Sequence, residues 1–251
     1  MYKLLFQIFL ASCYLLPGHA ISEDSNSLTL VVNSPGTRPH LYFNQDENKY
    51  DGVIPDLLRF AEKNSKLAIE FVDSHRNRNE KFVSSGKFDM FYSSIAWVKQ
   101  PTDFISTDPI FSHESFLYAL EPFADDFSLD RDTGAKVCTR RGFIYPRLEP
   151  LFTEGNLIRI DSSSHDTMLK MLILGRCDLV EMNLKNALAL IYSEEYVAHA
   201  FYQSPEPTSS VPASLIMNPK RTQERDLLNH FIAEFLAQGM YEKSLAKHIQ
   251  P

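Results

Sequence analysis

Two successive series of alternating strand and helix patterns constrain the fold of this chain more than any other feature of its sequence. The first series has short apolar runs at 28–32, 68–72 and 89–92, and apolar residues at helical spacing over 52–64. Turn-forming residues at 33–36 end the first run. Strands that alternate with helices form a parallel sheet covered by helices on both faces. The first series therefore predicts an α/β unit.

The same alternation restarts after an acidic stretch at 121–132. The second series consists of strand patterns and helix patterns at 136–139, 157–160, 165–174, 177–182 and 184–192. A Pro/Ser-rich segment at 204–212 is typical of a return connection, and it leads to a last short strand and an amphipathic helix over 224–237. We therefore predict an α/β protein of two βα lobes, with a ligand cleft between them at the carboxyl ends of the strands.

The predicted lobes are discontinuous in sequence. Lobe 1 comprises 27–117 plus 205–251, and lobe 2 comprises 121–200. The chain crosses between them near 117–121 and 200–212.

The first twenty residues are predicted to be a secretory signal peptide. Lys3 precedes an apolar run over 4–16, and the small residues Gly18 and Ala20 occupy positions −3 and −1 of a cut after Ala20. Residues 10–13 also resemble a bacterial lipobox, which would place a lipid on Cys13, but the apolar run continues beyond it. We favour cleavage near Ala20 and a periplasmic protein.

Charge and cysteine usage narrow the function further. The formal net charge of −7 leaves no basic excess for a nucleic-acid partner, and the body of the chain has no apolar run long enough to span a membrane.

Cys138 and Cys177 either pair in an oxidising compartment or remain two buried thiols. Neither has a metal-ligand neighbour. We predict a monomer without a metal or cofactor.

Six short motifs, in order, carry a resemblance to a known family. They are Tyr50-Asp-Gly-Val-Ile-Pro-Asp-Leu-Leu58, Ser85-Gly-Lys-Phe-Asp89 with Ser93-Ser94, Ser106-Thr-Asp-Pro-Ile-Phe111, Lys136-Val137 with Arg141-Gly-Phe-Ile-Tyr145, Leu174-Gly-Arg-Cys-Asp-Leu179 and Gln238-Gly-Met-Tyr-Glu-Lys243. The chain resembles the extracellular solute-binding proteins of family 3, type II periplasmic receptors that supply polar amino acids to ABC transporters. The resemblance implies a two-strand hinge and closure around a small solute.

The same resemblance predicts where the solute binds, and the sequence departs from it there. Family members hold the ligand carboxylate with hydroxyls and an Arg, and the ammonium with an Asp. The hydroxyls of Ser93 and Ser94 are present, but the Arg position falls on Gln100 and the Asp position on Asn183. An amide cannot replace a buried charge without loss of affinity. We therefore expect an atypical pocket for a small polar or anionic solute.

Further candidates come from loops that border the predicted cleft. Trp97 could form a stacking wall or be a half-buried strand-end aromatic, and Arg38, His40 and Arg78 could face the cleft or be solvated surface groups. The segment Arg141-Gly142-Phe143 precedes a helix of lobe 2, where backbone N–H groups can bind an anion.

Two alternatives to transport remain at this point. The protein could present its ligand to a membrane sensor instead of an ABC permease. It could also be a dehydratase-like enzyme on the same fold, for which Glu181 is the candidate acid. We predict no catalytic residues and no enzymatic activity.

Overall fold

A sheet of nine strands passes through both halves of the chain in the computed structural model, which describes residues 27–129 and 134–249. The strand order is β10-β9-β11-β8-β12-β6-β1-β5, and β7 pairs with β12. The predicted signal peptide at 1–20, with Cys13 and the cleavage site at Ala20, lies outside the described residues. None of the described helices is long and apolar enough to cross a membrane.

The first half of the sheet has three parallel strands with β1 at their centre, and β12 pairs antiparallel with β6 and β7 beside them. β1 pairs with β5 on one side and β6 on the other. The elements of this half are β1 (Ser27–Asn33), α1 (Val53–Lys63), β5 (Ala68–Ser74), α2 (Arg76–Ser84), β6 (Met90–Ser93), β7 (Ile105–Ser106), α6 (Thr222–Ala237) and α7 (Met240–Ile249). A small antiparallel sheet of β2 (Gly36–Thr37), β3 (Leu41–Asn44) and β4 (Lys49–Asp51) lies between β1 and α1 in the sequence.

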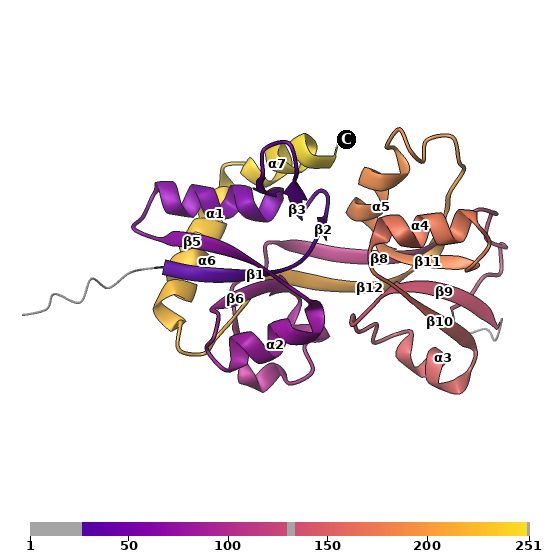
Figure 1. Cartoon of the computed structure of the whole chain (residues 1–251), viewed down its shortest axis with the longest axis horizontal. Helices are drawn as coiled ribbons and strands as arrows, with labels where there is room; N and C mark the ends of the chain where they lie inside the picture. Colours follow the sequence, from indigo (N-terminus) through magenta and orange to yellow (C-terminus); the bar gives the residue numbers. More distant parts are fainter. Residues whose placement is uncertain (1–26, 130–133, 250–251) are drawn as a thin grey trace, which may run out of the picture.

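The second half repeats the arrangement with β9 between two parallel neighbours, β10 and β11. Its elements are β9 (Ala135–Arg140), α3 (Glu149–Glu154), β10 (Leu157–Ser162), α4 (His165–Ile173), β11 (Leu179–Asn183) and α5 (Leu184–Ile191). In Figure 1 the two halves lie side by side, with β8 and β12 running between them. This confirms the predicted α/β fold of two βα lobes.

The two long strands β8 (Phe111–Ala119) and β12 (Tyr202–Met217) join the halves. They pair antiparallel from Tyr202 to Ala213, after which β12 pairs with β6. The Pro/Ser-rich segment 204–212 is therefore part of a strand. Register shifts around Pro207 let the pairing continue past residues that lack an N–H donor. Because both strands extend through both halves, the predicted lobe boundaries remain a prediction.

Each half has its own hydrophobic core, as the periodicity predicts. In lobe 1, Leu30 and Leu58 are fully buried against Phe231 of α6. In lobe 2, Met168 of α4 packs with Val180 of β11 in a separate cluster. Each Å² of apolar surface removed from water contributes about 25 cal/mol to the free energy of folding. Each lobe is therefore stabilised by its own core, independently of its contacts with the other lobe.

A disulfide bond joins Cys138 of β9 to Cys177, which lies in the turn between α4 and β11. Both cysteines are buried in the core of lobe 2. The pairing resolves the alternative that the sequence left open.

We expect loss of this disulfide to lower the melting temperature of the protein. The bond cross-links residues 39 positions apart, and loops of that size are stabilised by about 3 to 4 kcal/mol. Replacing both cysteines with serine should lower the melting temperature by about 6 to 16 °C, measured by calorimetry. Reductant should reproduce the loss in the wild type and change nothing in the double variant. A double variant that melts with the wild type would contradict this prediction.

Candidate functional site

A cleft lies between the two lobes at the carboxyl ends of β1, β6, β9 and β11. It encloses about 1060 Å³, including the part open to solvent. Its lining residues are Val31, Val32, Asn33, Gly36, Thr37, His40, Leu41, Arg76, Asn79, Tyr92, Ser93, Trp97, His113, Ser115, Arg140, Phe143, Ile144, Tyr145, Pro146, His165, Glu181, Asn183, Asn186, Thr208 and Ser209. Parallel strands direct their carboxyl ends to one edge, which is why these segments meet.

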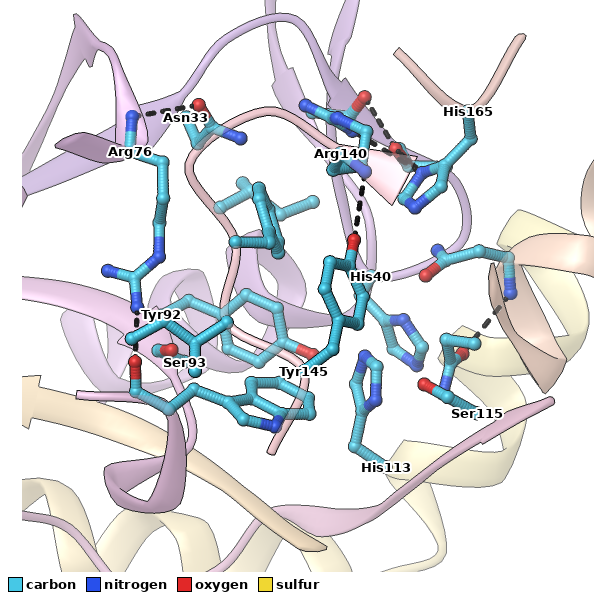
Figure 2. Close-up of a pocket in the computed structure, with 18 of the residues that line it drawn as sticks. Asn33, His40, Arg76, Tyr92, Ser93, His113, Ser115, Arg140, Tyr145 and His165 are labelled. Carbon is cyan, nitrogen blue, oxygen red and sulfur yellow. Dashed lines mark hydrogen bonds between the residues drawn. The ribbon is translucent and has the colours of Figure 1, made fainter. Parts of the chain in front are cut away.

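Arg76 brings a guanidinium to the cleft from lobe 1. It is the first residue of α2, and its side chain is 7% exposed. Nη2 donates to the Trp97 carbonyl at 3.0 Å and lies 3.1 Å from Glu80 Oε1, whereas the buried Nη1 has no partner. A dashed line in Figure 2 marks the hydrogen bond from this guanidinium. Burial lowers the pKa of Arg76, and Glu80 partly offsets the shift. One strong donor therefore remains available to a bound molecule.

Arg140 brings a second guanidinium from lobe 2. It ends β9 and is 3% exposed. Its Nη1 lies 3.4 Å from Nδ1 of His165, and its backbone N–H donates to the Tyr145 hydroxyl at 2.9 Å (Figure 2). In the described part of the chain no carboxylate forms a salt bridge with Arg140. Burial lowers the pKa of Arg140, and the neighbouring Tyr145 only partly offsets the shift.

The Phe143 ring lies near both arginines. Its centroid is 6.0 Å from Arg76 Cζ and 5.2 Å from Arg140 Cζ. The face of an aromatic ring attracts cations, so Phe143 helps to hold the two guanidinium groups in one region of the cleft.

Three histidines line the cleft as neutral rings. Burial lowers the pKa of His113 to about 3, and it also lowers the pKa of His40 and of His165 well below the usual value. The ring of His40 stacks on Phe111 with centroids 4.3 Å apart, and the ring of His113 meets the edge of Trp97. His40 Nε2 and His113 Nδ1 are buried without hydrogen-bond partners, as are Asn79 Oδ1 and the Tyr92 hydroxyl. Unpaired buried polar atoms are costly, so a cleft that gathers several of them suits a polar ligand.

Glu181 supplies a carboxyl group at the cleft wall. It lies on β11, is 5% exposed and accepts a hydrogen bond from Thr208 Oγ1 at 3.0 Å. Burial raises its pKa to about 7, although hydrogen bonds from Thr208 and Ser115 oppose the shift.

Direct contacts between the lobes close the cleft in this structure. The Thr37 hydroxyl of lobe 1 lies 2.8 Å from Nδ1 of His165 in lobe 2, and Asn186 Nδ2 donates to the Arg38 carbonyl at 2.5 Å. Gly142 approaches Asn77 of α2 so closely that a Cβ at this position would overlap the Asn77 side chain. The described conformation is therefore a closed one.

The cleft includes five of the residues that the sequence predicts for the site. They are His40, Ser93, Trp97, Phe143 and Asn183. Asn183 uses its side chain to cap α5 and to donate to the Glu114 carbonyl. Their roles in binding remain predictions.

Six predicted residues do not line the cleft. Ser94 caps the short 3-10 helix at Ile95–Trp97, and Gln100 precedes a second one at Pro101–Asp103. The others are Arg38, Arg78, Arg141 and Gly142. Arg76 and Arg140 occupy the cleft in place of Arg78 and Arg141. The signal that could have identified Arg140 is its place as the last residue of a parallel strand.

One group of potential metal ligands occurs among the described residues, outside the cleft. Asp51, Asp56 and His248 bring one ligand atom each within 4.8 Å of one another. Arg59 already lies 2.6 Å from Asp51 and 2.7 Å from Asp56, and His248 Nε2 lies 2.8 Å from Asp56. These contacts tie α7 to α1 and supply positive charge, so we propose no metal there.

Comparisons with known proteins agree with this architecture. The sequence model of the bacterial extracellular solute-binding proteins, family 3, matches residues 30–251. No curated protein matches the chain.

Solved structures share the fold at low sequence identity. An ancestral arginine-binding protein bound to arginine is 17% identical, with a TM-score of 0.73 over 88% of this chain and 97% of that one. A putative ABC-transporter binding component from Wolinella succinogenes, complexed with lysine, is 16% identical, with a TM-score of 0.75 over 89% and 96%. An ancestral amino acid-binding protein, a precursor of cyclohexadienyl dehydratase, is 15% identical, with a TM-score of 0.67 over 90% and 96%.

We expect the contact between Thr37 and His165 to stabilise the closed conformation. Thr37→Val keeps the shape of the side chain and removes the hydroxyl, which should cost about 1 kcal/mol and shift the balance about fivefold toward an open form. Small-angle X-ray scattering should then report a larger radius of gyration. Thr37→Ser keeps the hydroxyl and is the control. Equal radii for the two variants would show that this contact does not hold the lobes together.

Proposed function

The chain belongs to the bacterial extracellular solute-binding proteins, family 3, and on that premise we propose that it captures a small solute bearing an anionic group between its two lobes. The observation that carries the proposal is the pair of buried guanidinium groups, Arg76 from lobe 1 and Arg140 from lobe 2. An anion held between them would engage both lobes at once and would therefore favour closure.

The energetics of buried charge support an anionic ligand. Desolvating a guanidinium costs several kcal/mol unless a partner compensates it. Arg76 has Glu80 as a partner but keeps Nη1 unpaired. The Arg140 guanidinium has a neutral histidine and the Phe143 ring beside it, and none of the described salt bridges includes it. A carboxylate can accept two parallel hydrogen bonds from a guanidinium, which makes it the simplest ligand group for this site.

The proposed pocket is atypical for the family. The positions where the resemblance expects an Arg and an Asp carry Gln100, which lies outside the cleft, and Asn183, whose side chain is engaged in capping. The cations of the cleft come instead from the start of α2 and the end of β9. Ser93, Trp97 and Phe143 complete a wall of hydroxyl and aromatic groups that suits a small, partly apolar body.

The cellular role that we propose follows the family. The predicted signal peptide would export the chain to the periplasm, where the monomer would deliver its solute to an ABC permease. Delivery to a membrane sensor is the alternative, because both roles use the closed form as the signal.

A second candidate function is favoured by Glu181. With a pKa raised to about 7 by burial, its carboxyl group can hold a proton near neutral pH and donate it to a leaving hydroxyl, as a dehydratase requires. We place this function second because the matching family and the solved structures named above are described as binding proteins. An assay that detects dehydrated product formed from a hydroxylated carboxylate would place the enzymatic function first.

The proposed function predicts strong and selective effects of arginine substitutions. Arg76→Gln and Arg140→Gln should each weaken binding of carboxylates by more than about thirtyfold, because each removes a buried charge partner worth about 2 kcal/mol or more. Arg78→Gln and Arg141→Gln are matched controls, since neither side chain lines the cleft, and they should bind as the wild type does.

The measurement is a thermal-shift and calorimetric panel on the chain from residue 21, unfolded and refolded to remove carried-over ligand. The panel holds benzoate, pyruvate, succinate, L-glutamine, L-arginine and glucose. A carboxylate at a hundred times its Kd should stabilise the protein by about 2.7 kcal/mol. Circular dichroism of each variant establishes that it folds. Equal losses in the Arg141 and Arg140 variants, or binding of glucose alone, would contradict the proposal.

A further inference from the structure

The carboxyl group of Glu181 has an unusual environment for an acid in a binding cleft. Its hydrogen-bond partners, Thr208 and Ser115, belong to β12 and β8, the two strands that join the lobes. None of the salt bridges among the described residues includes Glu181. The acid is thus solvated by two neutral hydroxyls and by no cation.

A count of charges shows what Glu181 does to the cleft. Arg76 is balanced by Glu80, Arg140 is unbalanced, and the three histidines are neutral. With Glu181 protonated, the cleft carries one net positive charge, which a monoanion neutralises. With Glu181 ionised, the cleft is already neutral, and a bound monoanion would leave one uncompensated negative charge in a buried site.

We propose that the cleft takes up its anion together with one proton, and that Glu181 is the residue that holds this proton. The inference rests on the proposed function, because it describes how the same site accommodates an anionic solute. It assigns the ligand as an anion without a cationic nitrogen, since an ammonium group would call for the ionised form of Glu181.

The surroundings of Glu181 give the direction of the coupling. The titratable groups that line the cleft with Glu181 are His113 of β8, Arg140 of β9, Tyr145 and His165. Tyr118 of β8 lies in the core of lobe 2, outside the lining, and interacts with Glu181 electrostatically. Lys185 of α5 and Glu206 of β12, which pairs with Arg147, lie on adjoining elements. Burial has already raised the pKa of Glu181 to about 7. A bound anion raises it further, so binding is strongest below pH 7 and weakens as the pH rises.

The histidines set the pH window for a test. In the closed conformation burial lowers the pKa of His40, His113 and His165. A histidine that is exposed in an open form would therefore release its proton on closure at a pH near or below the usual pKa of about 6.5, and this release would oppose the effect of Glu181. An exposed histidine with a pKa of about 6.5 is still about a quarter protonated at pH 7, whereas at pH 8 and above it is almost entirely neutral, so the test is made at pH 8 to 9. Glu181 is then the cleft group whose proton changes with binding.

The test is isothermal titration calorimetry with benzoate, a planar monoanion that lacks an amine and stays ionised across the window. Titrations in triethanolamine and in Tris, two cationic buffers that differ in ionisation enthalpy and add no competing oxyanion, report the number of protons taken up. The wild type should take up about 0.9 proton at pH 8, and its affinity should fall about ninefold between pH 8 and pH 9.

Two variants assign the proton to its residue. Glu181→Gln mimics the neutral acid, so benzoate should bind with an affinity that is independent of pH and within about twofold of the wild type at pH 7, with no proton uptake. Glu206→Gln removes an acid of β12 that lies outside the cleft, and it should keep the full pH dependence of the wild type.

Each other outcome overturns the inference and leaves the proposed function separately testable. Benzoate binding without proton uptake, or with uptake that persists in Glu181→Gln, would remove Glu181 from this role while anion capture stands. Preference for L-glutamine or L-arginine with proton release would assign Glu181 as a carboxylate partner for an amine. Failure of benzoate, pyruvate and succinate to bind at any pH would reject both the inference and the proposed function.

Discussion

The antiparallel pairing of β8 with β12 is the constraint on which the rest of this structure depends. Parallel strands meet at one edge within each lobe, and each lobe has its own core. Only a connection that belongs to both lobes can bring those two edges to face each other. β8 and β12 provide it by pairing from one lobe into the other. Ser115 and Thr208 of these strands also line the cleft and bond to Glu181, so the joining strands and the cleft acid are one hydrogen-bonded unit.

Buried charge is the second organising principle. A folded chain seldom buries a guanidinium without a counter-ion, because water is the best solvent for an ion. Here each lobe buries one at the cleft, and Phe143 lies close to both. The unpaired donor of Arg76 and the isolation of Arg140 are expensive for the protein alone and become favourable when an anion is present. The affinity for an anion and the closure of the lobes would thus both come from the same two buried guanidinium groups.

Closure in this protein combines contacts of different kinds. The bond of Thr37 with His165 and that of Asn186 with the Arg38 carbonyl act directly between the lobes, independent of any solute. The arginines act through whatever lies between them. A solute can shift the equilibrium between open and closed forms only by its preference for the closed form. The direct contacts therefore determine this equilibrium without solute, and the arginines determine how far a bound anion shifts it.

The sequence alone determined the fold class, the order of the family motifs, the missing charges at positions 100 and 183, and five residues of the cleft, because hydrophobic period and turn chemistry are local properties. Tertiary structure alone decided the rest. Strand alternation places Glu181 and Asn183 on one face but cannot say which face meets the cleft. Arg76 and Arg140 line the cleft, whereas Arg78 and Arg141, one or two positions away, do not. All four residues lie at or near the ends of elements, where packing in the folded protein, and not the local sequence, decides which side chain is buried. The Cys138–Cys177 bond and the pKa of Glu181 depend on distance and burial, which no local pattern encodes.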